Sequence, residues 1–203
     1  MRPVTRRLRV RAAFGILPRM RPPLAPGLLL ASPDLNDPHF RRAVVLLVQH
    51  DAEGAFGFNV NLRLDLTVRL ICEDVGLKWP ESPSPQVFYG GPVAPQQGFV
   101  LHGRSDRLPE AEPIGDALAF TTARAALEAW TARPEAPWRL ILGYAGWGPG
   151  QLDAELARGG WVPAPLDPET LFATPAEELW EATFARIGVR DLARLDTSSA
   201  HVH

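Results

Sequence analysis

Two apolar runs around residue 50 predict an antiparallel β-hairpin. Residues 43–50 form a β-branched run, and residues 55–61 place Phe56, Phe58 and Val60 at every second position. The segment Asp51-Ala52-Glu53-Gly54 between them is a four-residue turn that ends in glycine. The two runs are therefore expected to pair with each other.

The remaining pattern predicts helices and short strands around this hairpin. Residues 66–75 have helical spacing of their aliphatic side chains, with Asp65 placed as N-cap and Gly76 just past the end. Further strands are expected at residues 27–31, 86–89, 98–101, 117–120, 138–143 and 161–162, and further helices at residues 122–132, at residues 151–158, and from the capping-box pattern Thr174-Pro175-Ala176-Glu177 to about Ile187. Hairpins interleaved with separate helices, without regular βαβ alternation, favour an α+β fold.

Length and composition indicate one ordinary globular domain. The chain has 203 residues, of which 46% are hydrophobic and 22% charged, enough to bury one core. We divide it into an Arg-rich extension over residues 1–23, a single domain over residues 24–189 and a flexible tail over residues 190–203. The extension is expected to be disordered, or to follow from a start codon placed upstream of a true start at Met20.

Cysteine content and hydropathy bear on the compartment. No apolar run approaches the roughly 20 residues that a helix needs to cross a bilayer, so we expect no membrane association. Cys72 is the one cysteine, which rules out an internal disulfide and fits a reducing, cytoplasmic environment. No paired Cys or Cys/His spacing suggests a structural zinc site, and no cofactor motif is present.

Charge is unevenly distributed along the sequence. Six arginines precede Met20, whereas the first acidic residue is Asp34. The net charge of -2 therefore becomes about -8 when those arginines are set aside. A nucleic-acid-binding domain normally presents a basic face to the phosphates, so direct DNA binding by the folded part is disfavoured.

The glycine-rich segment at residues 143–150 precedes a predicted helix and has two interpretations. Exposed amides at a helix N-terminus can hold a phosphate or carboxylate, but the segment matches neither the P-loop nor the dinucleotide fingerprint. Alternatively, the glycines let Tyr144 and Trp147 pack closely at a strand-to-helix corner.

Candidate catalytic groups are few. His50 and His102 each end a predicted strand and could share a metal site if a carboxylate such as Asp51 or Asp153 joined them, although ordinary hydrogen-bonded histidines are the plainer interpretation. Ser32 is not in a nucleophile elbow, and Cys72 is expected to be a buried, inert thiol. Asn59 and Asn61 point to one face of a strand, where they either face a cleft or cap a neighbouring turn.

A series of sequence blocks between about residues 26 and 188 resembles the YqgE/AlgH family of bacterial proteins. The blocks, in order, are Gly27 to Pro38, His50, Gly54-Ala55-Phe56-Gly57, Asn61, Gly90-Gly91-Pro92-Val93, Gly98-Phe99-Val100-Leu101-His102, Gly143-Tyr144-Ala145-Gly146-Trp147, Gly150-Gln151-Leu152, Trp161, and Leu171-Phe172-Ala173-Thr174-Pro175 with the helix that follows. Many members have a cysteine where Val48 stands and Lys-Pro or Arg-Pro where Leu62-Arg63 stands. A thiol-based redox role at position 48 is therefore not expected.

The resemblance implies a bifurcated, mostly antiparallel sheet curled into a pseudo-barrel and flanked by helices. It also implies a cytosolic protein, with a possible link to transcriptional regulation through the AlgH name, but it carries over no catalytic residues. Loops of such folds usually hold the binding groups. We therefore hypothesise a non-catalytic regulatory or binding protein, whose small ligand or protein partner meets His50, Asn61, Gly90, Gly91, His102, Tyr144, Trp147 and Gln151. The alternative is a hydrolase or metal-dependent enzyme that uses His50 and His102.

Overall fold

The fold is a curled sheet with helices around it. The computed structural model describes residues 23–35, 37–122 and 124–189, so residues 1–22 of the predicted extension and the whole predicted tail lie outside the described residues. The strands are β1 (Gly27–Ala31), β2 (Val44–Asp51), β3 (Gly54–Asn59), β4 (Arg63–Thr67), β5 (Gln86–Tyr89), β6 (Val93–Gly103), β7 (Glu112–Ile114), β8 (Leu118–Thr121), β9 (Arg139–Trp147) and β10 (Trp161–Ala164). The α-helices are α1 (Val68–Asp74), α2 (Arg124–Ala132), α3 (Gln151–Ala157), α4 (Pro168–Ala173) and α5 (Leu179–Arg186).

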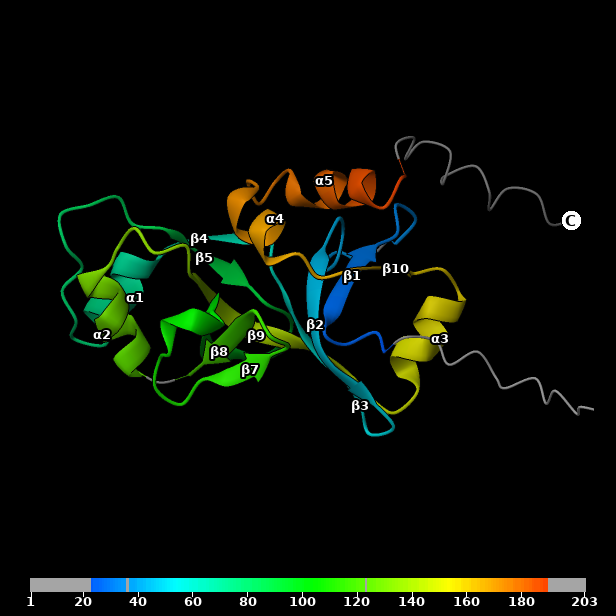
Figure 1. Cartoon of the computed structure of the whole chain (residues 1–203), viewed down its shortest axis with the longest axis horizontal. Helices are drawn as coiled ribbons and strands as arrows, with labels where there is room; N and C mark the ends of the chain where they lie inside the picture. Colours follow the sequence, from blue (N-terminus) through cyan, green and yellow to red (C-terminus); the bar gives the residue numbers. More distant parts are fainter. Residues whose placement is uncertain (1–22, 36, 123, 190–203) are drawn as a thin grey trace, which may run out of the picture.

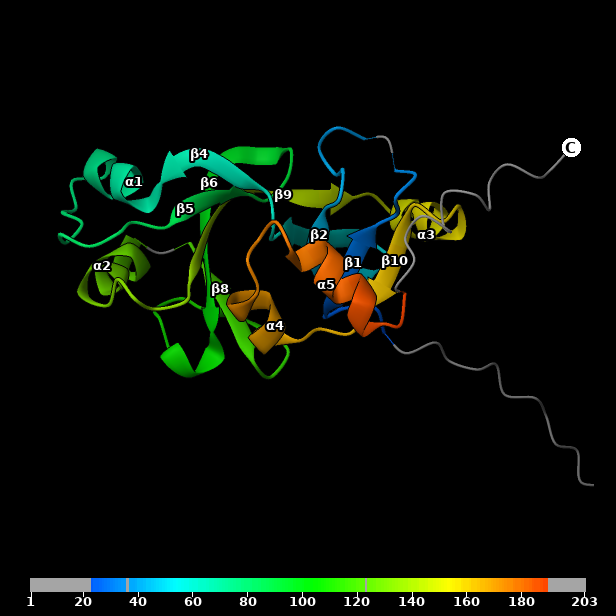
Figure 2. The ribbon, with the colours of Figure 1, turned by 90° about the horizontal axis from the view of Figure 1, so that it is seen from above.

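The long strand β9 joins two half-sheets. Half-sheet 1 has the order β10-β1-β2-β3 and pairs with the end of β9, while half-sheet 2 contains β4 to β8 and pairs with its beginning. All these pairings are antiparallel except that between β5 and β9. Figures 1 and 2 show α1 and α2 at one end of the molecule, α3 at the other, and α4 and α5 over the middle. The α+β prediction, with a bifurcated sheet that curls, is confirmed.

Glycines permit the backbone crossing at which the two half-sheets divide. A Cβ on Gly91 (φ +152°) would lie 2.3 Å from the Tyr144 carbonyl, and one on Gly143 (φ +70°) would lie 2.4 Å from the Gly91 carbonyl. Real Cβ atoms do not approach a backbone so closely, and L side chains rarely adopt these φ values. The segment before β6 can therefore lie directly against β9.

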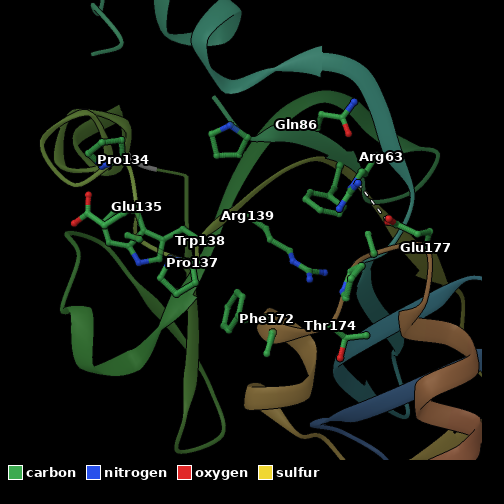
Figure 3. Close-up of a pocket in the computed structure, with 16 residues that line it drawn as sticks. Arg63, Gln86, Pro134, Glu135, Pro137, Trp138, Arg139, Phe172, Thr174 and Glu177 are labelled. Atoms are coloured by element: carbon green, nitrogen blue, oxygen red, sulfur yellow. Dashed lines mark ion pairs between the residues drawn. The ribbon is translucent and has the colours of Figure 1, made fainter. Parts of the chain in front are cut away.

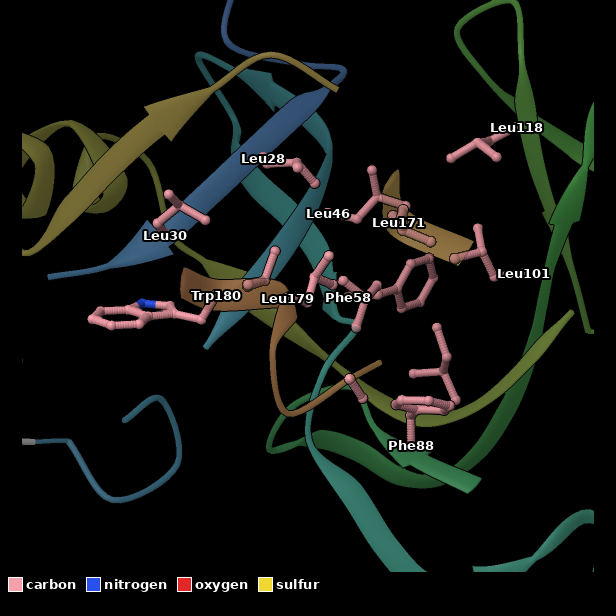
Figure 4. Close-up of a cluster of buried hydrophobic side chains, with 14 of the residues drawn as sticks. Leu28, Leu30, Leu46, Phe58, Phe88, Leu101, Leu118, Leu171, Leu179 and Trp180 are labelled. Atoms are coloured by element: carbon pink, nitrogen blue, oxygen red, sulfur yellow. The ribbon is translucent and has the colours of Figure 1, made fainter. Parts of the chain in front are cut away.

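The main core lies between the curled sheet and helices α4 and α5 (Figure 4). Phe58 and Leu179 are fully buried in it, and the indole N–H of Trp180 donates to the Ala31 carbonyl at 2.9 Å. Full burial of one such side chain contributes about 1.5–3 kcal/mol. A second cluster beneath α1 and α2 contains Trp79, Trp130 and Trp138, and a third beneath α3 contains Trp147 and Trp161.

Local sequence signals identified most elements, with informative exceptions. The hairpin is confirmed as β2 and β3, whose register has Asp51 opposite Gly54. The predicted helix 66–75 is wrong at its start, because Leu66 belongs to β4 and the N-cap is Thr67 rather than Asp65. The last helix begins at Leu179 instead of near Thr174, which ends α4 as its C-cap. Within the described ranges, no helix is both long and apolar enough to cross a membrane.

Candidate functional site

A cleft of about 690 Å³ opens between half-sheet 2 and the connection from α4 to α5 (Figure 3). Strand β5 contributes Phe88 to its lining, the start of β9 contributes Arg139, and the end of α4 contributes Phe172. Two segments that contain proline complete the wall on either side, at residues 134–138 after α2 and at residues 173–177 from the end of α4 onward. Strands and a helix therefore hold the key side chains of the cleft in place.

Arg139 is a buried cation within this cleft. Its exposed fraction is 6%, and its terminal nitrogens donate to the backbone carbonyls of Val60 and Leu171. A guanidinium carries five N–H groups, so the two carbonyl acceptors leave other N–H groups of Arg139 available to a ligand. The guanidinium carbon lies 4.8 Å from the Phe88 ring centroid and 5.9 Å from that of Phe172. Both aromatic faces contribute favourable cation–π contacts.

No carboxylate among the described residues forms an ion pair with Arg139. Burial, followed by repulsion from Arg63, lowers the pKa of Arg139 to about 10. The side chain therefore keeps its positive charge at neutral pH. Carbonyl dipoles and aromatic faces stabilise that charge but do not neutralise it, and a buried cation without a counter-ion is costly for a folded protein.

The second cation of the cleft is already neutralised. Arg63 on β4 forms an ion pair with Glu177 at 3.3 Å, and both side chains are substantially exposed (Figure 3). Glu135, the other acidic residue of the lining, is exposed. Arg139 is thus the unpaired cation among the described residues that line the cleft, and a bound anion would satisfy it through charge-assisted hydrogen bonds.

His50 and His102 do not come together. His50 lies near the hairpin turn, where its Nε2 is 3.3 Å from the carboxylate of Asp153. His102 lies in β6 with no exposed surface, donates from Nδ1 to the Gly103 carbonyl at 2.7 Å, and packs against Trp138. Among the described residues, no three His, Cys, Asp or Glu side chains are grouped to hold a metal ion. The enzyme alternative based on these two histidines is therefore not favoured.

Asn61 and Gly90 have structural hydrogen-bond partners, and Gly91 lies against the backbone of Tyr144. The Asn61 side chain accepts from the Val44 amide at 2.7 Å and donates to the Arg42 carbonyl at 3.0 Å. The Gly90 amide donates to Leu142 of β9 at 2.8 Å. The Asn61 contacts hold the segment that follows β3 against the start of β2, and the Gly90 contact holds the segment after β5 against β9.

Tyr144 and Trp147 line a separate hollow of about 330 Å³ with acidic residues of the hairpin turn. Gln151 lies nearby but directs its amide to Gly148 and to Glu155. The glycine-rich segment continues β9 through Trp147 instead of forming a loop, and Gly150 adopts φ +69° before the seven-residue helix α3. Ligand binding at this hollow remains a prediction.

Arg139 was not among the candidates drawn from the sequence. The signal was present, because a single arginine interrupts the buried run Trp138-Arg139-Leu140-Ile141-Leu142. A charge inside a buried strand requires a special environment. The thiol prediction is consistent with the structure, since Cys72 is fully buried and burial raises its pKa.

Comparison with known proteins gives consistent matches over almost the whole described chain. The family model described as AlgH-like matches residues 28–191. A UPF0301 protein of Xanthomonas euvesicatoria is 41% identical over 182 residues, covering 88% of this chain and 96% of that protein. One from Thioalkalivibrio sulfidiphilus is 38% identical over 179 residues, covering 85% and 94%.

Solved structures agree with the same assignment. The solution structure of the AlgH protein from Pseudomonas aeruginosa superposes with a TM-score of 0.68 at 34% identity, covering 88% of this chain and 96% of that one. The crystal structure of a Corynebacterium diphtheriae protein, DIP2367, gives a TM-score of 0.66 at 25% identity, covering 83% and 91%.

Proposed function

The chain belongs to the AlgH-like family, and from this premise we propose that it is a non-catalytic binding protein whose ligand is a small organic anion held by Arg139. The observation that carries the proposal is the buried guanidinium in the cleft, which has no carboxylate partner among the described residues. An anion on its spare N–H groups would supply the missing counter-charge. Hydrogen bonds to charged groups contribute about 1.5–3 kcal/mol each.

The proposal also includes a regulatory role, in which the bound anion changes the position of α4. Arg139 also donates to the Leu171 carbonyl of α4, so a ligand on the guanidinium acts directly on the position of that helix. The connection to α5, residues 173–177, lines the same cleft. Occupancy would thereby change the surface that a partner protein meets at α4 and α5, without any chemical step.

The composition of the cleft supports binding over catalysis. Its described lining holds no Ser, Cys or His, Thr174 is its one aliphatic hydroxyl and has no histidine beside it to act as base, and its carboxylates are exposed or paired with Arg63. A general base or nucleophile needs a positioned partner and a perturbed pKa. Arg139 cannot supply either function at neutral pH, because it stays protonated.

Isothermal titration calorimetry at low ionic strength tests the proposal with acetate, benzoate and inorganic phosphate. We expect saturable binding of at least one probe to the wild type, and an affinity at least about tenfold lower in Arg139→Met, since a charge-assisted hydrogen bond is lost. Arg139→Lys, which keeps the charge, should retain part of the affinity. Circular dichroism establishes whether each variant is folded.

A second variant keeps the test decisive if Arg139→Met does not fold. Arg63→Gln removes a positive charge from the rim of the cleft and should lower the anion affinity by roughly two- to fivefold, as expected for an exposed charge. The matched control Arg158→Gln, an exposed position at the end of α3, should have no effect. Failure of all three anions to bind the wild type, or equal binding by Arg139→Met, would overturn the proposal.

A further inference from the structure

A second hollow adjoins the Arg139 cleft and differs from it in character. Its volume is about 430 Å³, and it shares Pro137, Phe172 and Ala173 with the cleft. The rest of its described lining is apolar or backbone, with Glu169 as its one ionisable side chain. Apolar surface that remains in contact with water is a place where a hydrocarbon group can be buried favourably.

Phe172 connects the two spaces. Its ring contacts the cation, since the Arg139 guanidinium carbon lies 5.9 Å from the centroid of the Phe172 ring. The same residue also lines the apolar hollow, next to Leu118 of β8. A ligand that places its anionic group on Arg139 can therefore lay an apolar body along Phe172 and into the hollow.

The charges of the cleft limit how negative such a ligand can be. The unpaired charge is the single positive charge of Arg139, because Arg63 is paired with Glu177. Glu135 on the rim and Glu169 in the second hollow would repel any excess negative charge. One negative charge neutralises the site, whereas two would exceed what it can compensate.

We propose that the ligand is a monocarboxylate with an apolar body, bound with its carboxylate on Arg139 and its hydrocarbon part in the hollow lined by Phe172 and Leu118. This inference rests on the proposed function, because it requires that Arg139 bind an anion. It adds the chemical class: an amphiphilic carboxylate, such as a medium-chain or aryl-substituted acid. Inorganic phosphate and compact dianions bind poorly.

A homologous series of straight-chain carboxylates tests the class. Butanoate, hexanoate, octanoate and decanoate are titrated into the protein by calorimetry, below their micelle concentrations. Each buried methylene should raise the affinity about fourfold, which follows from ~0.8 kcal/mol per methylene. Octanol, which lacks the charge, and octyl phosphate at pH 8.5, which is mainly dianionic, should both bind more weakly than octanoate.

A blocking variant locates the apolar body. Ala117 is exposed and lines the second hollow, so Ala117→Trp fills that space without disturbing the core. It should abolish the dependence on chain length, so that octanoate and decanoate bind no more tightly than butanoate. Ala157→Trp, at an exposed position of α3 on the other half-sheet, is the control and should behave as the wild type.

The outcomes separate this inference from the proposed function. The proposal of an amphiphilic ligand is overturned if short carboxylates bind through Arg139 but longer ones bind no more tightly. It is also overturned if Ala117→Trp keeps the full dependence on chain length. In both cases the proposal that Arg139 binds an anion stands. If octyl phosphate binds more tightly than octanoate, the preference for a monoanion is overturned. If no anion binds, both proposals fail.

Discussion

Glu155 of α3 is expected to be the most sensitive acidic position outside the cleft. One of its carboxylate oxygens accepts both the Trp147 indole N–H at 2.9 Å and the Trp161 indole N–H at 2.8 Å, and the other accepts from Gln151 at 3.0 Å. The two tryptophans are only 7% and 3% exposed. In Glu155→Ala, both buried indole donors lose their acceptor.

The expected loss of stability follows from these two indole N–H groups without an acceptor. An unsatisfied buried donor costs about 1–3 kcal/mol, and water entering the space left by the side chain recovers part of it. We therefore expect Glu155→Ala to lower the free energy of unfolding by about 3 kcal/mol, which corresponds to roughly 6–12 °C in Tm for a domain of this size. Glu155→Gln keeps an oxygen acceptor and should lose only about 1 kcal/mol.

Urea denaturation followed by circular dichroism and tryptophan fluorescence measures these differences. Glu128→Ala serves as the control, since its i,i+4 ion pair with Arg124 is about half exposed and should contribute less than about 1 kcal/mol. The reasoning is refuted if Glu155→Ala stays within about 0.5 kcal/mol of the wild type, or if Glu155→Gln is as destabilised as Glu155→Ala.

Three further predictions concern the backbone, pH and the thiol. Gly91→Ala, whose added Cβ would meet the β9 backbone at 2.3 Å, should cost more than about 2 kcal/mol in urea denaturation, whereas Gly76→Ala, at a helix end with nothing within 4 Å, should cost about 1 kcal/mol. The hydrogen bond from the Thr170 side chain lowers the pKa of Asp167, so its stabilisation is present above about pH 4 and is lost as the pH falls. The difference in Tm between wild type and Asp167→Asn should therefore shrink between pH 6 and pH 2.5, and a constant difference would contradict this. Cys72, fully buried with a raised pKa, should react with a thiol reagent only in urea, and rapid labelling of the native protein would refute its burial.

The elements that could be predicted from the sequence are those whose determinants are local. The β2–β3 hairpin depends on two alternating runs and a glycine-ended turn, all within residues 43–61. The segment around Leu66 was assigned to a helix because its leucines also fit helical spacing. In the structure Arg63 pairs with Phe88 of β5, a partner 25 residues away that no local pattern identifies.

The candidate site was predicted less well because its parts are distant in sequence. Arg139 is bonded to carbonyls at residues 60 and 171, and its aromatic neighbours come from β5 and α4. Gly90 and Gly91 were predicted to contact a ligand, and the segment that begins at Gly143 was left with a binding and a packing interpretation, because a glycine that permits a backbone crossing has the same local appearance as one that admits a ligand. Only the three-dimensional arrangement distinguishes the two cases.

The position of β9 in the chain has a consequence for synthesis on the ribosome. Strands β1 to β3 are made first, yet the strand that completes their half-sheet on one side is β9 and the strand on the other side is β10. The helix α5, which covers their buried face with Trp180, emerges later still. The apolar surface of nascent β1 to β3 therefore stays uncovered until more than a hundred further residues have been made, and in that interval the chain is most prone to aggregation and most in need of a chaperone.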